Sequence, residues 1–276
     1  MVLQQNSEVN FWGKANPSKK ITILVSWKKK KYDVIADNTG NWQIKIKTTA
    51  ASFQKHFIAI EGENKIELNN VLLGEVWFSS GQSNMELPMR RVADAEKEIN
   101  EATFPFIRLF NVKKKKADQP ETEISAGSQW LECAPESVKE FSAMSYYFAR
   151  KMQRELNVPI GIISANWGGT GAECWTPAEK MKDNTVLKNI YSRWDKWSLD
   201  YKNDSISFTE AKKNNPKLEE PKSVYMMSRP HRRPSVLFNA MVNPLIPYTI
   251  KGVIWYQGTS NRDWANEYLE QMKALI

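Results

Sequence analysis

Serine and glycine gather in three short stretches of this chain, and each stretch directly follows an apolar segment typical of a β-strand. The stretches are residues 77–85, 166–171 and 255–261, and together they hold five of the 12 glycines. A serine in a tight turn after a strand can expose its hydroxyl as a nucleophile, and nearby backbone N–H groups can donate to a developing oxyanion. Ligands of open parallel sheets bind at the carboxyl ends of the strands. The three stretches therefore predict one site for acyl-transfer chemistry.

Two serines are candidates for the nucleophile, because the first and third stretches share the pattern Gly-x-Ser-Asn. Ser83 occupies it in residues 81–84, and Ser260 occupies it in residues 258–261. Neither matches the Gly-x-Ser-x-Gly elbow of many hydrolases; in the first stretch residue 85 is methionine. The residues alone leave both serines open.

The middle stretch is suited to binding an anion rather than to attack. Its hydroxyl residue is Thr170, which is surrounded by Gly168, Gly169 and Gly171. Glycines allow close backbone approach and leave N–H groups free to face a negative charge. This stretch is therefore a candidate source of oxyanion donors.

Histidine limits the mechanism, because the chain has only two histidines, His56 and His231. A serine nucleophile needs a neighbouring base, most often histidine. His56 is expected at the start of a strand, in a structural or solvent-facing role. His231 falls in a polar stretch rich in lysine and proline, and a mechanism that needs a histidine base must use one of these two residues or obtain one from elsewhere.

Residues 1–72 have the pattern of an all-β domain. Short alternating segments separated by turn residues predict strands at Val9–Trp12, Ile21–Trp27, Tyr32–Ala36, Trp42–Lys47, Phe57–Glu61 and Lys65–Leu68. This spacing is typical of a small sandwich or jelly roll.

Residues 73–276 change to alternating strands and helices, which predicts a mainly parallel sheet flanked by helices. The expected strands are Glu75–Ser79, Phe106–Phe110, Ile160–Ser164 and Lys251–Tyr256, and the expected helices are Arg91–Glu101, Ser142–Leu156 and Trp264–Ile276. Residues 177–235 interrupt the pattern as an insertion, with a helix expected near Asn189–Leu199.

Charge and composition exclude several other classes of protein. The chain has 39 Lys+Arg against 31 Asp+Glu, a net charge of +8, but lysine runs 28–31 and 113–116 fall where loops are expected. No zinc-finger spacing or aromatic RNA-binding motif accompanies them, so we expect no nucleic-acid partner. No apolar run approaches the ~20 residues of a membrane span. Two cysteines do not suffice for a disulfide scaffold or a zinc cluster.

The sequence resembles the sialate O-acetylesterase family of SGNH hydrolases over essentially its whole length. The similar blocks are Gly74–Glu86, Ile160–Thr170, and Pro234–Val242 continuing through Gly252–Gly258. The resemblance implies a flavodoxin-like SGNH fold and an esterase that removes O-acetyl groups from carbohydrates through an acetyl-serine intermediate, without metal or organic cofactor.

The resemblance also assigns roles to residues of the three stretches. Ser83 matches the nucleophile, which resolves the choice between the two serines. The amide of Gly168 or, preferably, Gly169 matches an oxyanion donor, as does the side chain of Asn261. Gln257 and Thr259 are expected to line the site.

Two departures from the family pattern affect these expectations. Thr259 stands where relatives usually carry glutamate, and no Asp-x-x-His block, the usual source of the base, occurs in the chain. Together with the abrupt helix at the end, this favours the hypothesis of a C-terminally truncated esterase. The β-domain of residues 1–72 is separately expected to lack its first strand. The chain alone is then expected to be weakly active or inactive.

Other functions and properties stay open from the sequence. The tryptophans would also suit a non-catalytic carbohydrate-binding protein, and acetylxylan-esterase-like activity on plant glycans is compatible with the same site. The resemblance implies a periplasmic, extracellular or lysosome-like compartment, although residues 1–6 have no export-signal pattern. Oligomeric state is not predicted.

Overall fold

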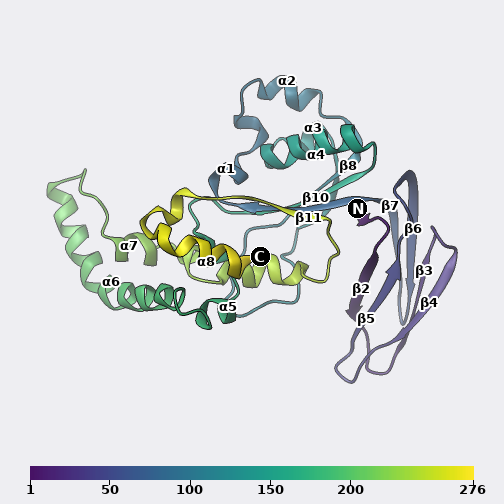
Figure 1. Ribbon diagram of the computed structural model, residues 1–276, viewed down its shortest axis with the longest axis horizontal. Coiled ribbons are helices and arrows are strands. Elements are labelled where there is room, and N and C mark those ends of the chain that lie inside the picture. The colour runs from purple at the N-terminus through teal and green to yellow at the C-terminus, as the bar shows by residue number, and fades with distance from the viewer.

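One long strand, β7 (Lys65–Gly81), runs through both halves of the protein in the computed structural model, which describes residues 1–276 (Figure 1). The sequence predicted two separate strands here, Lys65–Leu68 and Glu75–Ser79. They are continuous because β7 has hydrogen-bonding partners along its length, first β6 and then β1, β10 and β11. The boundary expected between residues 72 and 73 therefore falls inside a strand.

The amino-terminal part is all-β, as its alternating pattern predicted. One sheet has the order β4-β3-β6-β7, and β2 pairs with β5 in a second. The bounds are β2 (Glu8–Lys14), β3 (Lys20–Val25), β4 (Lys30–Ile35), β5 (Asn41–Lys47) and β6 (Ser52–Glu61). Apolar side chains from both sheets, including Phe11, Ile23 and Ile46, form one shared core.

The carboxyl-terminal part contains the predicted mainly parallel sheet. Strands β11, β7, β10 and β8 are parallel in that order, and β9 adds antiparallel to β8. The bounds are β8 (Phe104–Asn111), β9 (Trp130–Cys133), β10 (Ile160–Asn166) and β11 (Gly252–Tyr256), with the short β1 (Val2–Gln4) parallel to β7. Gly81 of β7 is paired with both Asn166 of β10 and Tyr256 of β11. The three strands that precede the glycine stretches therefore end side by side.

Helices cover both faces of this sheet (Figure 1). Ile162 of β10 packs in a core with Tyr146 of α4 (Ala143–Leu156), whereas the next residue, Ile163, packs in a core with Trp175 and Leu237. Burial on both faces explains why β10 is apolar without alternation. On the first face also lie α1 (Ser83–Glu86), α2 (Ala95–Asn100) and α3 (Pro135–Val138); on the second lie α5 (Ala178–Lys182) and α8 (Ala265–Leu275).

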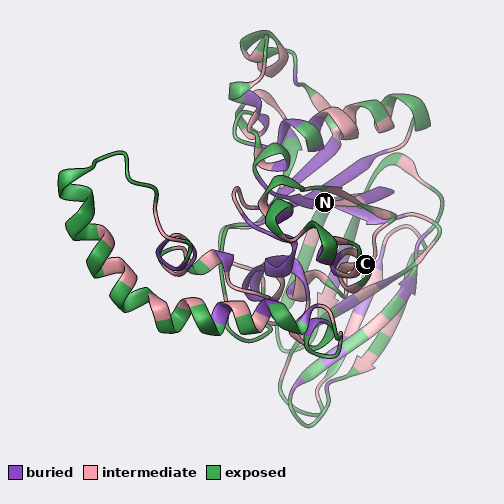
Figure 2. Cartoon of the chain, turned by 60° about the vertical axis from the view of Figure 1, so that its left-hand side comes forward, coloured by how far each residue is buried: buried purple, intermediate pink, exposed green.

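Two helices differ in length from the predictions. The expected helix Arg91–Glu101 is reduced to α2, because Asp94 adopts a positive φ of 56° immediately before it. The helix expected at Asn189–Leu199 extends over 27 residues as α6 (Lys188–Asn214) and is followed by α7 (Lys222–Met227). Most of α6 projects into solvent (Figure 2), so its far half has no apolar stripe to reveal it. No helix of the protein has the length and apolar character needed to span a membrane.

Candidate active site

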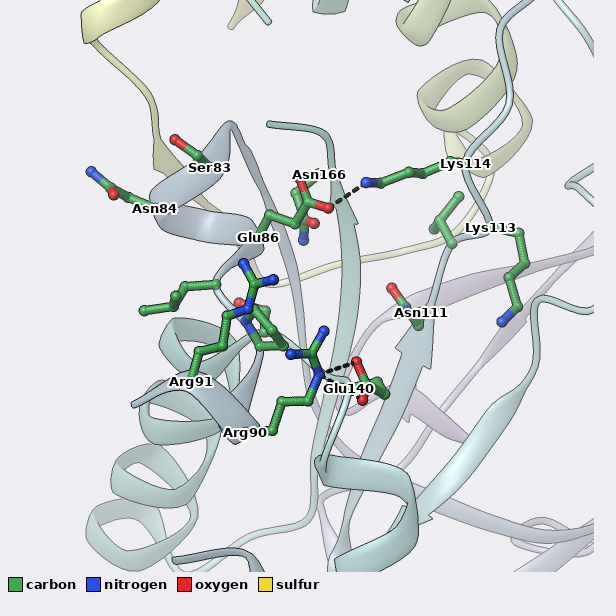
Figure 3. A pocket seen from close by; sticks show the side chains of 14 residues that line it. Ser83, Asn84, Glu86, Arg90, Arg91, Asn111, Lys113, Lys114, Glu140 and Asn166 are labelled. Atoms are coloured by element: carbon green, nitrogen blue, oxygen red, sulfur yellow. Dashed lines mark hydrogen bonds and ion pairs between the residues drawn. The ribbon is translucent and has the colours of Figure 1, made fainter. Parts of the chain in front are cut away.

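Ser83 lies in the turn that connects β7 to α1, at the carboxyl end of the central strand. It is the first residue of α1, its side chain is exposed, and its hydroxyl makes no hydrogen bond within the protein (Figure 3). The turn is fixed to the neighbouring strand because Gln82 N–H donates to the Tyr256 carbonyl at 3.2 Å. At the first position of a helix, the backbone N–H also has no intrahelical acceptor. The serine therefore combines an accessible hydroxyl with an unused helix N–H.

The glycines after β10 pack directly beside this turn. A β-carbon built on Gly168 would lie 3.6 Å from both Cα and Cβ of Ser83. The N–H of Gly168 donates to the carboxylate of Glu86, whereas the N–H of Gly169 has no acceptor in the protein. Gly169 also adopts a φ of 74°, a region that favours glycine. Of the two candidate donors, Gly169 is the one with a free N–H.

The third stretch is joined to the first by side-chain hydrogen bonds. Gln82 donates to the Thr259 hydroxyl at 2.7 Å, and its carbonyl oxygen accepts from Gln257 at 3.2 Å and from the Ser260 N–H at 3.3 Å. Gln257 and Thr259 thus lie in the group of strand-end residues, and their expected role in lining the site stays a prediction. These bonds hold the three loops in one arrangement.

Asn261 lies nearby but is buried, and both ends of its amide are already engaged. Its nitrogen donates to Glu173 at 2.8 Å, and its oxygen accepts from the Ala172 N–H at 2.9 Å and from Gln257 at 2.6 Å. An amide nitrogen carries two hydrogens, and the bond to Glu173 uses one of them. Its expected role stays a prediction.

Ser83 stands at the rim of a cavity of about 720 Å³ that has strongly charged walls (Figure 3). Lys114 forms an ion pair with Glu86, and Arg90 pairs with Glu140 at 2.8 Å, while Arg91 is exposed and has no ion pair. Sequence reasoning missed Glu86 and Lys114 as site residues. The pattern of residues around the glycine stretch does not indicate them, because Glu86 is 82 residues away from Gly168 in the sequence and meets it only in the folded protein.

His231 lies closer to the glycine stretch than its place in an insertion suggested. Its ring stacks on that of Trp167, with centroids 4.7 Å apart, and Lys114 lies 5.3 Å above the same Trp167 ring. Burial lowers the pKa of His231, and the nearby cations Arg232, Lys114 and Arg229 lower it further. No hydrogen bond joins His231 to Ser83, so the structure contains no assembled serine–histidine pair.

His56 lies in the amino-terminal sheet, inside β6 rather than at the start of a strand, because β6 begins at Ser52. It is buried, its Nδ1 lies 3.2 Å from the Ser26 hydroxyl, and burial lowers its pKa. These contacts give His56 a role in packing the amino-terminal sheet.

The side chains do not form a metal site. No group of three or more His, Cys, Asp or Glu residues is arranged to hold an ion, and Cys133 and Cys174 are both buried and unpaired. Burial raises the pKa of both thiols.

A mostly parallel sheet flanked by helices, with an accessible serine and one free glycine N–H at the strand ends, matches the α/β hydrolase fold. Several known proteins are similar to the chain. It is 29% identical to the sialate O-acetylesterase of Homo sapiens over 277 residues, 95% of this chain and 47% of the relative, and 26% identical to that of Mus musculus over 287 residues, 96% and 51%.

A solved structure, a carbohydrate acetylesterase from Xanthomonas citri, superposes with a TM-score of 0.78 at 28% identity, covering 99% of this chain and 53% of that one. No protein-family model matches the chain. The resemblance to the sialate O-acetylesterases is confirmed, since relatives of that name are similar to nearly the whole of this chain. The chain spans about half the length of the curated relatives it matches.

Proposed function

We propose that this chain removes O-acetyl groups from carbohydrates, with Ser83 as the nucleophile. The observation that carries the proposal is the contact of the exposed Ser83 with the glycine stretch, where Gly169 has a free N–H. The names of the similar proteins, sialate O-acetylesterase and carbohydrate acetylesterase, support the class of substrate.

In the proposed reaction, the Ser83 oxygen attacks the carbonyl carbon of the acetyl ester and loses its proton to a base. The tetrahedral oxyanion accepts hydrogen bonds from the N–H groups of Ser83 and Gly169. The carbon–oxygen bond to the sugar then breaks, and the sugar leaves as its alcohol after taking up a proton. Water hydrolyses the acetyl-serine to acetate and restores the hydroxyl.

No histidine base is in hydrogen-bonding contact with Ser83. The 276 residues contain no Asp-x-x-His motif, and His231 makes no hydrogen bond to Ser83. Loss of one triad member lowers the rate by several orders of magnitude while leaving catalysis above the rate in water. We therefore expect slow hydrolysis, or none, from this chain by itself.

The test is hydrolysis of 4-nitrophenyl acetate and of an O-acetylated sugar by the wild-type chain, Ser83→Ala and Ser260→Ala. The two serines share the pattern Gly-x-Ser-Asn, so they are matched variants. Ser83→Ala is expected to abolish any acetate release that exceeds the rate in buffer, and Ser260→Ala to lose far less. Mass spectrometry of a quenched reaction should find acetyl on Ser83.

A larger loss in Ser260→Ala than in Ser83→Ala would contradict the assignment. Sugar binding without acetate release, in this chain and in a longer chain that includes an Asp-x-x-His block, would instead favour a non-catalytic carbohydrate-binding protein.

A further inference from the structure

Trp12 is an exposed tryptophan that belongs to none of the apolar cores of the protein. Its strand β2 buries Val9 and Phe11 on one face, and Trp12 lies on the other face with 38% of its side chain exposed. Tryptophan is enriched at binding surfaces, because its ring offers a large apolar area together with one hydrogen-bond donor. Trp12 therefore marks a candidate binding surface in the β-rich part.

Side-chain amides border this ring on the same face of the two-stranded sheet. Gln43 of β5 is paired directly with Trp12, and Asn41 lies two residues before Gln43 on the same face. Gln43 donates to Asn10 at 3.0 Å and Asn41 donates to Thr39 at 2.7 Å, while the side-chain carbonyl oxygens of Gln43 and Asn41 accept no hydrogen bond. The indole is thus bordered by groups that can both donate and accept hydrogen bonds.

Trp12 and these amides line a cavity of about 490 Å³ between the two parts of the protein. β2 and β5 form the side of the β-rich part that faces the parallel sheet (Figure 1), and Thr122, Asn243 and Pro247 line the cavity from the other part. Asn10 donates to the Pro247 carbonyl at 2.7 Å, which holds the two walls together. The volume lies within the range of about 300–1,000 Å³ that is typical of small-molecule sites.

The walls of this cavity carry little charge, in contrast to those of the cavity at Ser83. Its one ionisable side chain is Asp37, whose carboxylate accepts hydrogen bonds from the Thr39 hydroxyl at 2.7 Å and from the Asn41 N–H at 3.0 Å. No cation lines the cavity. Aromatic, amide and hydroxyl groups without a cation suit a ligand that is polar but uncharged.

A sugar ring fits this combination better than a proline-rich peptide does. A pyranose presents C–H groups on its faces and hydroxyls around its rim, so it can stack on an indole while its hydroxyls bind amides. Proline-rich peptides dock in grooves lined by aromatic rings. The second tryptophan of this cavity, Trp42, is only 9% exposed, because its ring packs against Gly13, where a β-carbon would lie 2.8 Å from it. A single open ring remains.

We propose that Trp12, Asn41 and Gln43 form a binding site for an uncharged sugar unit of a glycan. The indole stacks on one face of the pyranose, and the two amides bind its hydroxyls. No residue lines both this cavity and the one at Ser83, so the site anchors a glycan and takes no part in the chemistry. The inference goes beyond the proposed function and does not depend on it.

The test is calorimetric titration of the wild-type chain and of Ser83→Ala with unacetylated cellohexaose, xylohexaose and mannohexaose. Both proteins are expected to bind at least one of these sugars. Trp12→Ala is expected to weaken that binding about tenfold or more, the loss typical of an aromatic contact, and Trp12→Phe to keep part of it. The matched control is Phe57→Ala, because Phe57 is also 38% exposed in the β-rich part but does not line the cavity.

Failure of the wild-type chain to bind any of the three sugars would overturn the proposal, as would unchanged binding by a folded Trp12→Ala or an equal loss in Phe57→Ala. Binding of decaproline at Trp12 in place of the sugars would assign the surface to a peptide and would also overturn it. If Trp12→Ala does not fold, Thr122→Arg decides, because Thr122 is exposed and a longer side chain there fills the cavity from the other part. Weakened sugar binding by Thr122→Arg supports the proposal, and unchanged binding overturns it.

None of these outcomes depends on hydrolysis. Failure of the proposed function would appear separately, as acetate release that Ser83→Ala leaves intact.

Discussion

Glu173 lies inside the protein between the second and third glycine stretches, where it accepts a hydrogen bond from Asn261. Burial is the largest influence on its carboxyl and raises its pKa above the usual value, an effect that the Asn261 hydrogen bond partly offsets. The folded state therefore holds a proton over a pH range in which the unfolded chain has lost it. Stability from this group is complete below the unfolded pKa and is lost as the pH rises through the folded pKa.

Glu173→Gln should remove this pH dependence, since glutamine can accept the same hydrogen bond without ionising. Relative to the wild type, the variant is expected to gain free energy of unfolding as the pH rises from 4 to 8, measured by urea unfolding. Glu136→Gln, at a surface helix, should show no such trend. A relative gain that shrinks with rising pH would contradict the assignment.

The site shows which residues a sequence can reveal. Ser83, Gly169, Gln257 and Thr259 lie in short stretches at strand ends, which local pattern singled out, but only the family resemblance assigned these residues their expected roles. Glu86 was not predictable as a site residue, because its contact with the Gly168 N–H joins segments that only folding brings together.

At the scale of elements, the strand alternation predicted nearly every strand, whereas lengths depended on tertiary partners. β7 continues past residue 68 because β1, β10 and β11 supply hydrogen bonds, and α6 continues past residue 199 without an apolar stripe. The length of β7 depends on contacts with distant segments, whereas most of α6 projects into solvent. The pattern of apolar and polar residues over a short segment therefore indicated whether an element is a strand or a helix better than it indicated where the element ends.

Gly74 makes the joint between β7 and β10 possible. A β-carbon at this position would overlap the carbonyl oxygen of Pro159, which is backbone and cannot turn away. Gly74→Ala is therefore expected to lower the free energy of unfolding by about 2 kcal/mol or more. Gly62→Ala is the control, because its added carbon would make an ordinary 3.8 Å contact with Ile21 and should change stability by no more than about 0.5 kcal/mol. Equal effects of the two substitutions in urea unfolding would contradict this account of the joint.

At the scale of the whole molecule, the two parts share more than a strand. Tyr248 packs against the cores of both, and its hydroxyl donates to the Val2 carbonyl at 2.5 Å. Val2 itself belongs to the core of the parallel sheet, although it lies at the start of the chain. The two parts are therefore expected to be coupled in stability.

Thermal or urea unfolding should accordingly show one transition, with tryptophan fluorescence and far-UV circular dichroism coinciding. Tyr248→Phe should keep the single transition and lower the free energy of unfolding by about 1 kcal/mol, since it removes one hydrogen bond and keeps the ring. Two separated transitions in the wild-type chain would show that the parts unfold independently.

The continuity of β7 also has a consequence for how such a protein can change over evolution. A domain joined by a flexible linker can be exchanged by recombination at the linker, but here an exchange near residue 72 would join halves of two different strands. The new strand would have to match the register of β6 at one end and of β10 and β11 at the other. The β-rich part and the serine turn at the end of β7 are thus expected to be inherited together, as one unit.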